Sequence, residues 1–123
     1  MRLLAIVTIL NVMTSLGFAT AGLVRPEAIL PVGLSATPAV TTFALYAFSR
    51  SLVLAGCAVG AAIRRRGSEL WLLGAIGALV QIADAAVGAY SADIGKTIGP
   101  LVVAGLQVCA LAAARRNPTW AAQ

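Results

Sequence analysis

Two charges inside apolar runs, Arg50 and Asp84, are the residues of this 123-residue chain best suited to chemistry. Arg50 ends the stretch Tyr46-Ala47-Phe48-Ser49-Arg50. A charge in lipid hydrocarbon costs about 2.5–3.5 kcal/mol on insertion scales unless it is paired, and intramembrane ionisable residues commonly mark functional sites. Arg50 needs a partner, and Asp84 is the acidic residue that lies within another apolar run.

The depths of the two charges match. Arg50 lies fourteen positions before Arg64, and Asp84 lies fifteen positions after Glu69. At ~1.5 Å per helical residue, these separations are ~21 Å and ~22 Å from the same membrane edge. We therefore expect Arg50 and Asp84 to meet at one level.

Other polar residues lie near this level. Gln81 falls on the Asp84 face and Tyr46 on the Arg50 face, because residues three or four apart are neighbours on a helix. Ser15 lies at a depth of ~20 Å, and two further polar residues lie at ~12–14 Å. The predicted catalytic residues are Asp84, Arg50 and Tyr46. The predicted ligand-binding residues are Gln81, Ser15, Asn11 and Gln107.

Proton transfer is the chemistry that these residues predict. A neighbouring guanidinium favours the carboxylate form of Asp84, so Asp84 would act as a base or an anchor. Tyr46 or water would supply protons. Isomerisation or cyclisation of an isoprenoid-like or quinone-like lipophile suits this setting.

Two alternative functions stay open. In a proton-coupled small transporter, Asp84 would be the transport site, and a homo-oligomer or a dual topology would be needed to enclose a pathway. In a non-catalytic membrane assembly protein, Arg50 and Asp84 would form a structural ion pair that specifies helix docking. No metal or cofactor is predicted, since the chain has no histidine. Cys57 and Cys109 are expected to pack as small apolar residues, although they share one depth.

The composition indicates that lipid is the solvent of this chain. Hydrophobic residues make up 60% of it and charged residues 11%, against about 25% charged in a soluble domain. A soluble chain this short could not bury so much apolar surface. The net charge of +5 comes from arginines at the ends of apolar runs, which argues for membrane orientation and against nucleic-acid binding.

One domain over residues 1–123 is predicted, with spans at residues 3–23, 41–63, 69–90 and 97–114. Each is close to the ~20 residues that cross ~30 Å of hydrocarbon. The extracytoplasmic loop, residues 24–40, holds three prolines that break any long helix. It would lie over the outer mouth of the bundle. Pro100 is expected in the first turn of the last span, where proline is tolerated.

The basic residues predict the orientation. Six lie on the side of the termini: Arg2, Arg64, Arg65, Arg66, Arg115 and Arg116. Only Arg25 and Lys96 lie on the other side. The four spans predict an all-α, antiparallel four-transmembrane-helix bundle. The positive-inside rule then predicts that both termini are cytoplasmic. Arg2 and Ala19-Thr20-Ala21 also resemble a signal peptide, but Asn11, Thr14 and Ser15 are unusually polar for a signal core.

Small residues predict close helix contacts. Gly56 and Gly60 form a small-xxx-small pair in the second span, and Gly74 and Gly77 lie on one side of the third. Such residues let helix backbones approach closely.

Several short motifs resemble a known group. These are Gly22-Leu23-Val24-Arg25-Pro26-Glu27, the Tyr46–Arg50 stretch, the basic turn, and Gln81-Ile82-Ala83-Asp84-Ala85. They resemble small bacterial four-helix membrane proteins related to the DoxX-like families, which are mainly of unknown function. The resemblance implies a bundle in the bacterial inner membrane with Arg50 and Asp84 as its polar pair. It implies no activity.

Overall fold

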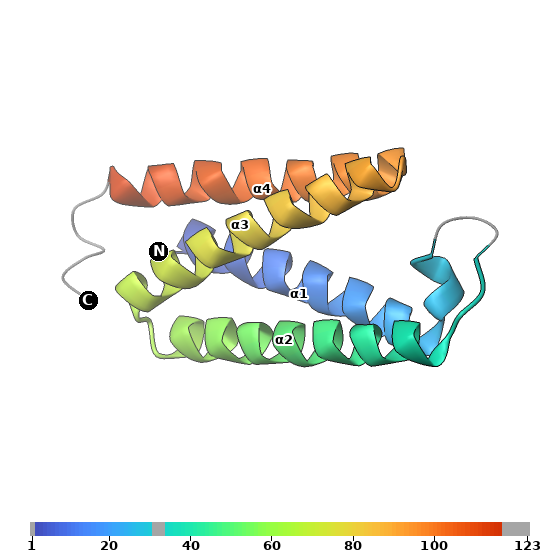
Figure 1. The fold of residues 1–123 in the computed structure, drawn as a ribbon. Coiled ribbons are helices and arrows are strands. Elements are labelled where there is room, and N and C mark those ends of the chain that lie inside the picture. Colours follow the sequence, from blue (N-terminus) through green and yellow to red (C-terminus); the bar gives the residue numbers. More distant parts are fainter. Residues whose placement is uncertain (1, 31–33, 117–123) are drawn as a thin grey trace.

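Four long helices make up most of the chain (Figure 1). The computed structural model describes residues 2–30 and 34–116. The helices are α1 (Arg2–Val24), α2 (Pro38–Ile63), α3 (Gly67–Tyr90) and α4 (Ile94–Arg115), and a 3₁₀ turn, η1 (Pro26–Ala28), follows α1. Each of the four is long and apolar enough to cross a membrane. The all-α fold with four candidate spans is therefore confirmed, and the helix ends lie within three residues of the predicted ends.

Local signals explain where α2 and α4 begin. The Thr37 hydroxyl accepts a hydrogen bond from the Val40 N–H at 3.4 Å, and the Asp93 carboxylate accepts one from the Lys96 N–H at 3.1 Å. Both are N-caps, which satisfy backbone donors that a helix start leaves free. Because α4 starts three residues earlier than predicted, Pro100 lies in its second turn and not in its first.

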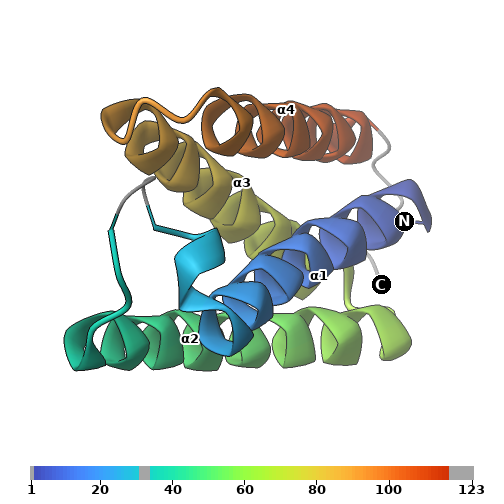
Figure 2. The ribbon, with the colours of Figure 1, turned by 90° about the vertical axis from the view of Figure 1, so that its right-hand side faces the viewer.

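The helices are unequally packed. In the two views, α3 crosses the molecule diagonally between α2 and α4 (Figure 2). The main contacts of α3 are with α4, and those of α1 are with α2. From the turn at Arg64–Arg66, α2 and α3 diverge along the molecule (Figure 1). The end of the molecule opposite this turn holds η1 and the Ser91–Asp93 turn.

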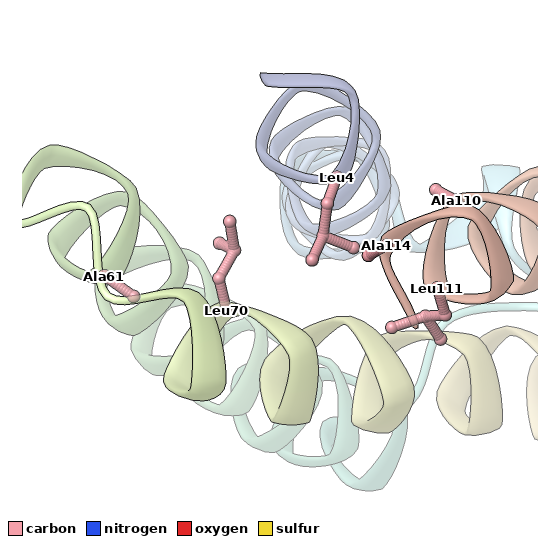
Figure 3. Packing of buried hydrophobic residues seen from close by; sticks show 6 residues of the cluster. All are labelled: Leu4, Ala61, Leu70, Ala110, Leu111 and Ala114. Carbon is pink, nitrogen blue, oxygen red and sulfur yellow. The ribbon is translucent and has the colours of Figure 1, made fainter. Parts of the chain in front are cut away.

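The apolar core sits towards the end of the molecule that holds the Arg64–Arg66 turn. Its buried side chains come from all four helices: Leu4, Ala61, Leu70, Ala110, Leu111 and Ala114 (Figure 3). Half of them are alanines, which let the helix backbones approach closely. Many large apolar side chains elsewhere are exposed, as expected of a multi-pass membrane protein, whose outer shell faces lipid.

The glycines predicted to allow close helix contacts do so on α3 but not on α2. Gly74 and Gly77 are buried against side chains of α1 and α4, as predicted. Gly56 and Gly60 were expected to make a close contact, but a Cβ atom at either position would have no neighbour within 4 Å among the described residues. Their face of α2 points away from the other helices, so that prediction is wrong within one copy of the chain.

Candidate functional site

A cavity of about 660 Å³ lies between the four helices. Each helix contributes to its wall, and Ile29, which follows η1, closes part of it. Ligand pockets commonly have volumes of ~300–1,000 Å³ and a mostly apolar lining with a few polar groups. Four of the seven predicted site residues line this cavity: Arg50, Asp84, Gln81 and Ser15. The structure therefore brings together residues from α1, α2 and α3 that the sequence placed at one depth.

Arg50 and Asp84 share the cavity without touching. Among the described residues, the ion pairs within 4.0 Å are Arg66–Glu69 and Lys96–Asp93. The expected direct Arg50–Asp84 contact is therefore not formed. The backbones of α2 and α3 diverge from the turn that joins them (Figure 1). Within the described part of the chain, neither side chain has a hydrogen-bond partner, and both residues line the cavity while staying partly exposed.

Gln81, in the cavity wall, belongs to a chain of hydrogen bonds that links α1, α3 and α4. Gln81 Nε2 donates to Asn11 Oδ1 at 2.9 Å and to Ser15 Oγ at 3.1 Å. Asn11 Nδ2 donates to Gln107 Oε1 at 3.2 Å, and Gln107 Nε2 donates to Thr8 Oγ1 at 3.0 Å. All except Ser15 are buried. A connected buried network of this kind satisfies its polar groups and fixes their orientation.

This network corrects the prediction for Asn11 and Gln107. Both were expected to bind a ligand, but neither lines the cavity. At their level α1 and α4 face each other directly, so the two amides bind one another. Their role in the structure is to hold Gln81. Thr8 was not predicted as a polar partner, although it lies on one face of α1 with Asn11 and Ser15, a spacing that could have indicated it.

Glycines on α3 make room for the network. A Cβ atom at Gly74 would lie 2.5 Å from Gln107 Nε2, and one at Gly77 would lie 2.9 Å from Asn11 Nδ2. Both distances are shorter than real Cβ contacts allow. The small residues predicted to aid helix packing therefore also admit the amide side chains.

Tyr46 lies outside the site. Its side chain is 64% exposed, and it does not line the cavity. Four residues along a helix rotate a side chain by about 400°, so Tyr46 is offset by about 40° from Arg50. The other cavity-lining residues of α2, such as Ala47 and Ser51, lie on the opposite side of Arg50, so this offset carries Tyr46 away from the cavity wall. The prediction that Tyr46 supplies protons to this site is not supported by its position.

Lys96 is a cavity residue that was predicted only to help set the orientation in the membrane. It lines the cavity, and Lys96 Nζ donates to the Ile29 carbonyl oxygen at 3.2 Å and pairs with Asp93 Oδ2 at 3.0 Å. The backbone N–H of Lys96, and then its ammonium group, lower the pKa of Asp93 below its ordinary value of 3.8. Lys96 thus joins the segment after η1 to the start of α4.

Other candidate chemistry lies away from the cavity. Cys57 and Cys109 are free and exposed. The described residues contain no group of three or more His, Cys, Asp or Glu side chains that could hold a metal ion. Near the opposite end of the molecule, the Arg115 guanidinium lies 4.5 Å from the centre of the Trp71 ring, a cation–π contact.

No protein-family model, curated protein or solved structure matches this chain. The resemblance to DoxX-like proteins therefore stays a prediction.

Proposed function

We propose that this chain is a membrane protein that binds a lipophilic small molecule in the cavity between its four helices. The observation that carries the proposal is the pair of opposite charges, Arg50 and Asp84, which line one cavity without forming an ion pair. Within a bilayer an unpaired charge is costly. A ligand with polar groups between the two side chains would compensate both, while the apolar wall would hold its hydrocarbon part.

The proposal includes a topology. The chain would be an antiparallel bundle in the bacterial inner membrane, of the DoxX-like type, with both termini cytoplasmic. Its support is the excess of arginine at the helix ends that flank the termini and the Arg64–Arg66 turn. The cavity would then lie towards the extracytoplasmic side, with η1 at its mouth.

A second candidate function is proton transfer to or from the bound lipophile. Asp84 accepts no hydrogen bond from the described residues, so its carboxylate is free to act as a base. The Arg50 guanidinium across the cavity would stabilise an oxyanion that develops on the substrate. Isomerisation or cyclisation of an enolisable lipophile fits this division of roles. The transport and assembly alternatives have no comparable observation in their favour.

Binding tests the first proposal directly. The purified protein in lipid nanodiscs would be titrated with Nile red, a fluorescent lipophile, and examined by native mass spectrometry for a co-purified molecule. We expect Arg50→Gln to weaken Nile red binding about tenfold or more, which corresponds to about 1.4 kcal/mol, because the dye has a carbonyl acceptor for Arg50 but no donor for Asp84. Arg64→Gln, a substitution on the exposed turn, is the matched control. A folded Arg50→Gln variant that binds the dye as tightly as the wild type would contradict the proposal.

A further inference from the structure

We propose that the head group of the ligand is electrically neutral and carries both a carbonyl acceptor and a hydroxyl donor. This inference rests on the proposed function and specifies the chemical class of the ligand. It follows from the charge balance of the cavity wall and from the hydrogen-bonding polarity of the two faces that meet there.

The charges of the site cancel. Three charged side chains among the described residues line the cavity: Arg50, Asp84 and Lys96. Asp93 neutralises Lys96 at 3.0 Å, which leaves one positive and one negative group for a ligand. An anionic ligand would compensate Arg50 and leave the Asp84 carboxylate without a partner. A cationic ligand would do the reverse. In a low-dielectric site an uncompensated charge is penalised, so a neutral head group is favoured over either ion.

The charged side chain that α2 contributes, Arg50, can only donate hydrogen bonds. The Arg50 guanidinium has five N–H donors and no acceptor, and none of these donors is used by the described part of the chain. The matching ligand group is an oxygen acceptor. A neutral head group excludes carboxylate and phosphate oxygens, and a carbonyl oxygen is a stronger neutral acceptor than an ether oxygen, so we assign a carbonyl.

The face contributed by α3 accepts hydrogen bonds. The Asp84 carboxylate can only accept. Gln81 Nε2 already donates to Asn11 and to Ser15, so the Gln81 amide has only its carbonyl oxygen left for a ligand. Both groups therefore call for a donor on the ligand, and we assign a hydroxyl group as a neutral donor. The hydrogen bonds that Gln81 donates to Asn11 and Ser15 thus leave only acceptor groups of Gln81 and Asp84 for a ligand.

Matched ligands test the inference. Three twelve-carbon compounds would compete with Nile red for the protein in phosphatidylcholine nanodiscs: 1-hydroxy-2-dodecanone, dodecanoate and dodecylammonium. Empty nanodiscs would correct for partition into lipid. We expect the hydroxyketone to displace the dye at concentrations at least about tenfold lower than either ion. Equal or tighter binding of dodecanoate or dodecylammonium to the wild type would overturn the inference.

Two variants sharpen the test by changing the charge of the site. Arg50→Gln leaves a net negative site and should shift the preference towards dodecylammonium, whereas Asp84→Asn should shift it towards dodecanoate. An unchanged order of affinities in folded variants would contradict the inference. If neither Nile red nor any of the three compounds binds the wild-type protein, the proposed function itself fails. If all three bind equally, binding stands and only the assignment of the head group is lost. The wild-type comparison decides even where a variant does not fold.

Discussion

Replacing Gly88 with alanine should separate α3 from α4. A Cβ atom at Gly88 would lie 2.7 Å from the Thr97 backbone nitrogen and closer still to the Lys96 carbonyl group. Ordinary contacts begin at 3.4 Å, so α4 must move by at least 0.7 Å, the difference between these two distances. Obstruction by backbone cannot be relieved by a rotamer change. Overpacking typically costs about 1–3 kcal/mol, and we expect Gly88→Ala to lie in the upper part of this range.

The proximity of the two helices has a sequence cause. Pro100 lacks an N–H group, so the carbonyl of Lys96, four residues earlier, lacks its usual helical donor. Gly88 lies directly against this carbonyl. A Cα–H group of glycine can make a weak hydrogen bond to such an oxygen at a helix interface, which a larger residue at position 88 would displace.

Unfolding in mixed micelles measures the effect. The protein would be titrated with sodium dodecyl sulfate and its unfolding followed by tryptophan fluorescence. Gly56→Ala is the matched control, because a Cβ atom there meets nothing within 4 Å, and its stability should stay within about 0.5 kcal/mol of the wild type. If Gly88→Ala also stays within that range, the close α3–α4 contact described above is refuted.

Three further predictions concern other contacts. Gln107→Leu should destabilise the bundle by about 1–2 kcal/mol, because it leaves the buried Asn11 amide without an acceptor for its N–H group; the same detergent titration measures this, and an unchanged midpoint would argue against the network. Arg115→Gln should cost about 0.5–1 kcal/mol through loss of the cation–π contact, and a red shift of Trp71 emission should accompany it; unchanged emission would count against the contact. The pKa of Asp93 is lowered in the folded protein, so its charge stabilises the fold above the ordinary pKa of 3.8, and this contribution is lost as the pH falls through the lowered value. The difference in melting temperature between wild type and Asp93→Asn should therefore shrink below about pH 4. A difference that is independent of pH would disprove this prediction.

The spans and the level of the charges could be predicted from the sequence. A run of about twenty apolar residues is a local property, and only a helix satisfies its backbone in lipid. The fixed rise per residue then places Arg50 and Asp84 at similar depths, and both line one cavity in the structure. Gln81 and Ser15 could be placed with them for the same reason.

Tertiary packing decided which side chains line the cavity and which lie on the outer surface of the bundle. The rotation of each helix and the divergence of α2 from α3 depend on contacts between residues distant in sequence. For this reason the direct Arg50–Asp84 contact and the inward position of Tyr46 were predicted wrongly. For the same reason the bond from Lys96 to the Ile29 carbonyl, 67 residues away, could not be predicted at all.

The stretch Tyr46–Arg50 shows the division clearly. Its sequence alone determined that an arginine lies in a membrane-spanning helix and at what level, because both depend only on composition and helical rise. Only the tertiary structure decided that Arg50 lines one cavity together with Asp84, while Tyr46, one turn away, lies outside that cavity and is exposed. The physical reason is that helix depth is a property of one helix, whereas a binding site is a property of how several helices are packed.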